Sequence, residues 1–173
     1  EELVKLSPAL NNSANGFAKG VEFIWRDKKP FKGVDYWISY SFLDTKRDYL
    51  NYPYALQPNF AANHTASLVV KKFITNWKTQ FNASYTFATG RPYYDFRFNA
   101  TENKFDVADQ GKTKSYNNLS LSINYLPSIG KANAKRFTVW VLSVTNVLNQ
   151  AQVYNYNYSY NGAIKRAVVP PAN

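Results

Sequence analysis

Strict alternation of side-chain character over long segments is the feature that most constrains this chain. In residues 77–90, WKTQFNASYTFATG, the row from Trp77 to Phe87 is largely aromatic or apolar, and the residues between are largely polar. Successive side chains of a β-strand point to opposite faces, so this pattern predicts a strand with one apolar and one polar face. Either a protein core or lipid would satisfy the apolar face, so the alternation alone does not distinguish them.

The same alternation recurs along most of the chain and predicts an all-β fold. It is clear in KGVEFIWR, VDYWISYSFL, HTASLVVKKF and NNLSLSINYL. We therefore expect an antiparallel meander of about six long strands, near residues 17–26, 34–44, 63–73, 77–89, 116–126 and 135–147. The last segment, RFTVWVLSVTNVLN, is apolar on both rows, so its facing is not defined.

The connections between these predicted strands alternate between short and long. The short ones are residues 27–33, 74–76 and 127–134, and the long ones are residues 44–62, 91–115 and the segment after Asn149. Short turns at one rim and long loops at the other are typical of outer-membrane β-barrels. Strands of about 10 residues also have the length that a tilted strand needs to cross a bilayer.

Composition excludes several classes of function. The chain has no cysteine, which excludes disulfide frameworks, thiol catalysis and cysteine-based zinc sites. Its net charge is +10, but Lys and Arg are dispersed and form no recognition helix, so we expect no nucleic-acid partner. Apolar runs are only a few residues long, far below the roughly 20 that a membrane helix needs.

No constellation of residues predicts catalysis or metal binding. His64 is the only histidine, and Ser67, three residues further on, would lie on the opposite face of the same strand. The stretch DVADQGK (106–112) lacks most ligands of a calcium loop. We therefore expect no enzyme activity, no metal and no cofactor.

Aromatic residues mixed with arginines and amides predict ligand contact in the long loops. RPYYDFRF (91–98) and YNYNYSYNG (154–162) supply the candidates, and RDYLNYPY (47–54) adds further tyrosines. Such side chains suit stacking on sugar rings or flat chelates, with charge for anionic groups. They also suit simple loop packing. The candidate ligand-binding residues are Arg91, Tyr93, Tyr94, Arg97, Tyr154 and Tyr156.

Three stretches of the chain resemble the carboxy-terminal barrel strands of TonB-dependent outer-membrane receptors. They are residues 63–94, 116–127 and 137–162, and the pieces ATGRPYY and SVTNVLNQ carry most of the resemblance. The family fold is a transmembrane barrel of about 22 strands around a plug domain. The resemblance implies a lead-in at 1–16, barrel strands with short periplasmic turns and long outer loops at 17–148, and a last outer loop at 149–173 that ends before the closing strand.

The resemblance also implies a location and a function. The chain would lie in the bacterial outer membrane, as part of a receptor that imports a siderophore, vitamin or glycan bound by its outer loops. Its partners would be the lipid bilayer, the remaining strands and plug of the full-length protein, and a TonB-type energy-coupling protein acting through that plug. The alternative is a soluble β-sandwich or ligand-binding barrel with its aromatic rows turned inward.

In the membrane interpretation, the polar row of two central strands faces the barrel lumen. Trp77, Phe81, Tyr85 and Phe87 would then face lipid. The predicted lumen-facing residues are Lys78, Gln80, Asn82, Ser84, Asn118, Ser120, Ser122 and Asn124.

Overall fold

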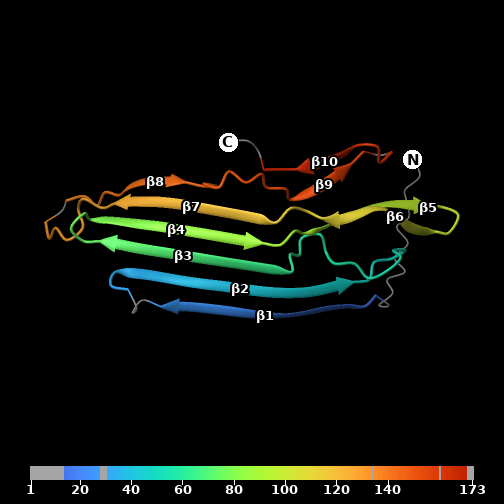
Figure 1. Cartoon of the computed structure of the whole chain (residues 1–173), viewed down its shortest axis with the longest axis horizontal. Helices are drawn as coiled ribbons and strands as arrows, with labels where there is room; N and C mark the ends of the chain where they lie inside the picture. Colours follow the sequence, from blue (N-terminus) through green and yellow to red (C-terminus); the bar gives the residue numbers. More distant parts are fainter. Residues whose placement is uncertain (1–13, 28–30, 134, 160, 171–173) are drawn as a thin grey trace.

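Six strands form one large antiparallel sheet (Figure 1). The computed structural model describes residues 14–27, 31–133, 135–159 and 161–170. The sheet is an uninterrupted meander except that a hairpin separates its fourth and fifth strands along the chain. Its members, in spatial order, are β1 (Gly16–Asp27), β2 (Val34–Arg47), β3 (His64–Ile74), β4 (Thr79–Ala88), β7 (Tyr116–Tyr125) and β8 (Trp140–Val144).

Two further hairpins lie at the end of the sheet that carries the long connections (Figure 1). Strands β5 (Pro92–Asn99) and β6 (Lys104–Lys112) form the first, and β9 (Asn155–Tyr158) and β10 (Lys165–Val168) form the second. The prediction of an all-β antiparallel meander with six main strands is therefore confirmed. The described strands form an open sheet. No helix among the described residues is long and apolar enough to cross a membrane.

The register of the sheet aligns like residues across neighbouring strands. One row that crosses five strands is polar throughout: Asp35, Lys71, Asn82, Ser122 and Ser143. The row one residue further along is apolar throughout: Tyr36, Val70, Ala83, Leu121 and Val144. Cross-strand partners share a face, so the alternation seen in each strand becomes two chemically distinct faces of the whole sheet.

No described segment of the chain forms a second layer over the apolar face. Buried hydrophobic residues among those described are only Leu56 and Ala61, and both lie in the connection between β2 and β3. Large side chains of the sheet remain open instead, such as Phe23 at 52% exposed and Leu142 at 67%. A folded soluble domain normally buries such residues in a core.

Several predicted strand ends differ from the observed ones by a few residues. Strand β4 begins at Thr79 rather than at residue 77, and Lys78 lies in the preceding turn with φ +51°. The Lys78 ammonium donates a hydrogen bond to the Pro127 carbonyl oxygen at 3.4 Å. Lys78 is thus not part of the polar row of β4 to which the sequence pattern assigned it.

Strand β8 is much shorter than the predicted strand 135–147. It pairs with β7 only over Trp140–Val144. Asn146 then adopts φ +51°, which turns the chain out of the extended conformation. An apolar run on both rows has no alternation from which its ends can be located, so this strand was the least well defined in the sequence.

Candidate ligand-binding site

Gly90 determines where the β5–β6 hairpin leaves the large sheet. A Cβ at this position would lie 1.9 Å from the Thr113 carbonyl oxygen, so only glycine allows the two backbones to approach so closely. The Thr113 amide donates to the Arg91 carbonyl at 2.8 Å, and the Arg91 amide donates to Thr113 Oγ1 at 3.0 Å. The Thr89 amide donates to the His64 carbonyl at 2.9 Å. The stretch ATGRPYY therefore joins the sheet to the hairpin.

The stretch SVTNVLNQ forms a second fixed turn at the same end of the sheet. The backbone N–H of Asn146 donates to Asn118 Oδ1 at 3.0 Å, and Asn146 Oδ1 accepts a hydrogen bond from the backbone N–H of Gln150 at 3.1 Å. Gln152 is buried and donates through Nε2 to the Asn117 carbonyl at 2.7 Å. These contacts direct the chain from β8 towards the β9–β10 hairpin.

The β5–β6 hairpin has two faces of different chemistry. Tyr94, Phe96 and Phe98 alternate along β5 with Tyr93, Asp95 and Arg97. The register shifts between Asp95 and Phe96, where β6 carries one extra residue. The bulge places Val107 and Phe105 opposite Phe96 and Phe98, so this face is apolar from the bulge to the hairpin turn.

The apolar face of the hairpin packs on the connection between β2 and β3. The Tyr52 ring lies 4.5 Å from Phe96 and 4.7 Å from Phe105, measured between ring centroids. Phe96 in turn stacks on Tyr94 at 5.5 Å, and Tyr49 lies 5.8 Å from Tyr52. This group of rings, which we call the aromatic cluster, comprises Tyr49, Tyr52, Tyr94, Phe96, Phe98 and Phe105. It holds the loop 48–63 against the hairpin.

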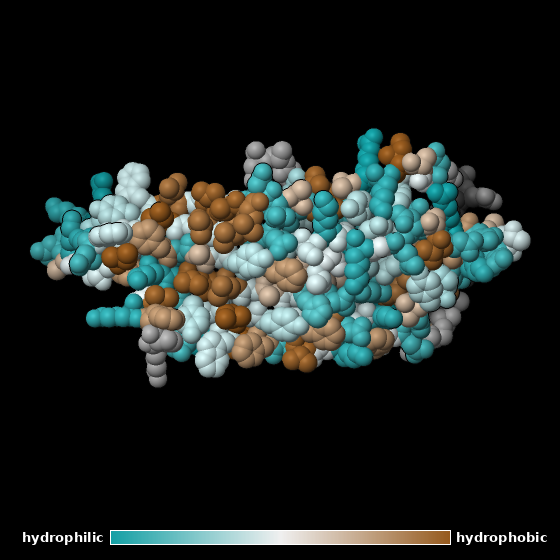
Figure 2. Space-filling view, viewed as in Figure 1, coloured by the Kyte–Doolittle hydropathy of each residue, from teal (hydrophilic) through white to brown (hydrophobic). Residues whose placement is uncertain are grey.

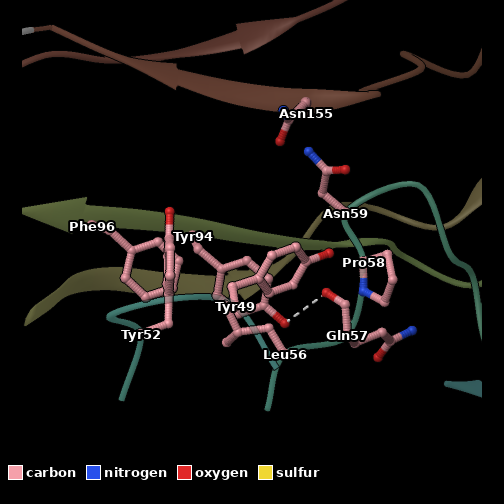
Figure 3. Close-up of a pocket in the computed structure, with 9 residues that line it drawn as sticks. All are labelled: Tyr49, Tyr52, Leu56, Gln57, Pro58, Asn59, Tyr94, Phe96 and Asn155. Carbon is pink, nitrogen blue, oxygen red and sulfur yellow. Dashed lines mark hydrogen bonds between the residues drawn. The ribbon is translucent and has the colours of Figure 1, made fainter. Parts of the chain in front are cut away.

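A pocket of about 250 Å³ opens beside the aromatic cluster (Figure 3). Three separate segments line it: the loop after β2, strand β5 and strand β9. Figure 3 shows the rings on one side and the Asn59 and Asn155 amides on the other. The lining residues are Tyr49, Tyr52, Leu56, Gln57, Pro58, Asn59, Tyr94, Phe96 and Asn155. None of them is charged.

The polar face of the same hairpin contacts the β9–β10 hairpin through Lys165. The Lys165 ammonium donates to Asp109 Oδ2 and to the Tyr93 hydroxyl, each at 2.8 Å. It also lies 4.0 Å from the centroid of the Tyr93 ring and 4.7 Å from that of Tyr156. The Tyr158 hydroxyl donates to the same Asp109 oxygen at 2.6 Å. We call Lys165, Asp109, Tyr93, Tyr156 and Tyr158 the hairpin contact.

Hydrogen bonds and burial shift the pKa values of three side chains at this end of the molecule. Hydrogen bonds from Lys165 and then Tyr158 lower the pKa of Asp109, and the hydrogen bond to Asp109 raises the pKa of Lys165. Burial is the main cause that raises the pKa of Tyr94. At neutral pH Asp109 and Lys165 are therefore charged, and the Tyr94 hydroxyl keeps its proton and donates to the Gln57 carbonyl at 3.2 Å.

The structure separates the predicted ligand-binding residues into different surroundings. Tyr94 lines the pocket, whereas Tyr93 and Tyr156 belong to the hairpin contact. Arg97 pairs with Asp95 at 3.7 Å, and its guanidinium fills the space beside Gly162 where a side chain would begin. The other two candidates lie elsewhere: Arg91 is exposed beside the hairpin neck, and Tyr154 lines a different groove with Gln150 and Val169.

Sequence reasoning did not select the amides that line the pocket or the charges of the hairpin contact. Gln57 and Asn59 lie in one loop outside the selected stretches, Asn155 lies between two selected tyrosines but was not itself selected, and Asp109 and Lys165 are 56 residues apart. The tyrosines of RDYLNYPY did indicate that the loop 48–63 could contact a ligand, and two of them line the pocket.

His64 has an aromatic environment. Its Nδ1 lies 2.8 Å from the Tyr40 hydroxyl, and its ring lies 5.1 Å from Phe42. Among the described residues, no group of three or more His, Asp or Glu is placed to hold a metal ion.

No protein-family model matches the sequence, and no curated protein or solved structure matches it either.

Proposed function

We propose that this chain forms part of the barrel wall of a TonB-dependent receptor in the bacterial outer membrane. In this proposal its loops bind a bulky nutrient, a siderophore, vitamin or glycan. The observation that carries the proposal is a belt without charged residues across the apolar face of the described strands, bounded by polar or charged residues.

The belt is seen most directly along two strands. On β3, His64 and Lys72 bound the apolar residues Ala66, Leu68 and Val70 on the same face. On β1, Lys19 and Asp27 bound Val21, Phe23 and Trp25 in the same way. From residue 64 to 72 there are eight steps of about 3.3 Å, or about 26 Å along the strand. A strand tilt of about 40° shortens this to about 20 Å, close to the roughly 25 Å apolar band of known barrels.

Strand length and loop placement support the same proposal. Strands β1 to β4 and β7 have 10 to 14 residues, at or above the roughly 9–11 that a tilted strand needs to cross the bilayer. All three long connections lie at one end of the sheet (Figure 1). In the view of Figure 2, hydrophobic residues gather over the strands, and hydrophilic residues predominate where the two small hairpins lie.

The polar face fits the lining of a barrel lumen. Gln80, Asn82, Ser84, Asn118, Ser120, Ser122 and Asn124 all lie on this face, in register from β4 to β7. Asn82 donates to Ser122 Oγ across the strands at 3.0 Å, and the Arg26 guanidinium donates two hydrogen bonds to the Asp35 carboxylate. In the proposal, the outer edges of β1 and β8 pair with the remaining strands of the receptor, since open sheet edges are not tolerated in lipid.

A soluble β-sandwich is the competing interpretation. It needs a second layer over Phe23, Leu68 and Leu121, and none of the described segments covers these side chains, which are 39% or more exposed.

The plug and the TonB-type coupling protein are further parts of the proposal, because the family transports its ligand through them.

Cysteine labelling of intact cells tests the orientation and the membrane location together. The chain has no native cysteine, so single substitutions give a clean signal. Thr101→Cys and Asn161→Cys, in the turns of the two small hairpins, should react with a membrane-impermeant maleimide. Asn76→Cys, in the exposed turn between β3 and β4, should react only after the cells are lysed. Equal reaction at all three positions in intact cells would contradict the proposal.

A further inference from the structure

We propose that the pocket beside the aromatic cluster binds one sugar ring of a neutral oligosaccharide. This inference rests on the proposed receptor function, because it assigns a ligand class to the loops of that receptor. It is carried by four features of the pocket: its size, its lack of charge, its two chemically different walls and two amides that bond no other described residue.

The volume limits the ligand to a single ring-sized group. Pockets that enclose a whole drug-sized ligand have volumes of roughly 300–1,000 Å³, and this one has about 250 Å³. A bulky metal chelate or a vitamin with a large macrocycle would not enter. A chain of sugars would place one residue inside and extend the others over the neighbouring loop surface.

The absence of charge among the lining residues argues against an anionic ligand. Sites that select carboxylate, phosphate or ferric chelates use Arg or Lys, often in pairs that form two hydrogen bonds. The two arginines among the predicted ligand-binding residues, Arg91 and Arg97, do not line the pocket. Arg97 is instead paired with Asp95. The pocket therefore favours a neutral ligand.

The two walls match the two surfaces of a sugar ring. One wall carries the rings of Tyr49, Tyr52, Tyr94 and Phe96, and Tyr49 is 43% exposed, so part of its ring is free to stack. The C–H face of a pyranose packs on such a ring as an apolar surface. The opposite wall carries the Asn59 and Asn155 amides, which suit the hydroxyl groups at the edge of the same sugar (Figure 3).

These two amides have hydrogen-bonding capacity to spare. Neither the Asn59 nor the Asn155 side chain forms a hydrogen bond to another described residue. By contrast, the third amide of the pocket, Gln57, donates to the Ala61 carbonyl and to Asn63 Oδ1. A ligand with several hydroxyl groups can hydrogen-bond to both amides, and each such bond adds to affinity and to selectivity.

The test is a binding measurement on the full-length outer-membrane protein in detergent. Isothermal titration calorimetry would use neutral oligosaccharides from glucans, mannans and galactans, each alongside its permethylated form, with an oligouronate and a ferric hydroxamate for comparison. We expect at least one neutral oligosaccharide to bind and its permethylated form not to bind, because methylation removes the hydroxyl donors. Tyr49→Ala should weaken that binding about five- to a hundredfold. Asn59→Ala and Asn155→Ala should each weaken it about two- to tenfold.

Two control variants lie close to the pocket without lining it. Phe60→Ala removes an exposed ring beside Asn59, and Asn157→Ala removes an amide two residues along β9. Both should leave the affinity unchanged. The inference is overturned if no neutral oligosaccharide binds at about 10 mM, if binding survives all three pocket substitutions, or if the oligouronate or the hydroxamate binds through Tyr49.

The two proposals fail separately in this design. Heat-dependent mobility on a gel reports whether the barrel is folded, whatever it binds. A folded barrel that binds no neutral oligosaccharide overturns the ligand class and leaves the receptor function intact. A water-soluble protein that binds a neutral oligosaccharide through Tyr49 would support the ligand class and overturn the receptor function.

Discussion

An arginine on one face of strand β4 should prevent assembly, whereas an arginine on the other face should be tolerated. Ala83 and Ser84 are neighbours near the middle of the strand, and their side chains point to opposite faces. Ala83 lies between Val70 and Leu121 on the apolar face, and Ser84 lies between Val69 and Ser120 on the polar face. We predict that Ala83→Arg prevents most of the protein from reaching the folded barrel, whereas Ser84→Arg has little effect.

The magnitude follows from the depth of Ala83 in the proposed bilayer. It is four residues from Thr79 and five from Ala88, or about 13–17 Å along the strand from either end. An arginine there cannot easily reach water, and at the midplane it costs about 2–4 kcal/mol. That corresponds to roughly thirty- to nearly a thousandfold in the folding equilibrium. Arginine at Ser84 would face the lumen, beside other polar groups.

A third variant distinguishes lipid from a protein core. Ala83→Leu adds apolar volume at the same position. In a packed core it should cost about 1–3 kcal/mol through overpacking, whereas lipid accommodates it without penalty. The measurement is the fraction of heat-modifiable, protease-resistant protein in the outer membrane, compared with total expression. Equal yields of Ala83→Arg and Ser84→Arg would refute the assignment of faces, and a loss with Ala83→Leu would refute contact with lipid.

Further predictions concern the loop end of the molecule. Gly90→Ala should make residues 91–115 more sensitive to proteolysis than Gly111→Ala does, because the first Cβ would overlap a backbone oxygen and the second would meet the movable end of a tyrosine; equal cleavage would contradict this. Lys165→Met should increase amide exchange in residues 155–168, while the neighbouring Arg166→Met should not, and unchanged exchange in both would show that the hairpin contact does not hold the hairpin. The same contact should weaken in acid. The folded-state pKa of its carboxylate is lowered, so its stabilisation is present above the usual carboxylate range and is lost as pH falls through the lowered value. The pKa of Lys165 is raised, so its contribution persists through neutral pH and is lost only as pH rises through that raised value. Exchange rates would be corrected for their intrinsic pH dependence. If acidification then raises exchange in the wild type by no more than in Lys165→Met, the expected weakening of the hairpin contact in acid is contradicted. Asn146→Gly should retain more folded protein than Asn146→Ala, because glycine keeps the φ of +51° accessible, and equal yields would remove backbone strain as the reason for asparagine there.

The main sheet could be predicted from the sequence because its signal is local. Each strand carries its own alternation, and the short turns leave few ways to pair neighbours other than as a meander. The same logic fails for β8, where both rows are apolar and the strand end depends on the hydrogen bonds of Asn146. It also fails at Lys78, where a turn conformation takes precedence over an alternation that continues through the residue.

The candidate site was only partly predictable because it depends on contacts between distant segments. The aromatic loops were visible as composition, and Tyr94, one of the predicted ligand-binding residues, lines the pocket. Tyr93 has the same character in the sequence, yet a one-residue difference turns it to the other side of the hairpin, towards Tyr156. Asn59 carries no sequence signal, since an isolated asparagine in a loop is common whatever its role, and Asn155 is not distinguished from the other asparagines of YNYNYSYNG.

The two-sided β5–β6 hairpin has a consequence for how such a loop evolves. Positions 94 and 96 line the pocket, and positions 93 and 97 face the neighbouring hairpin, all within one strand of eight residues. In the proposed receptor, selection on ligand preference and selection on loop placement therefore act on separate, alternating positions. Descendants of this sequence can change what the pocket accepts by substituting one set while inheriting the other, so new preferences arise without a new loop structure.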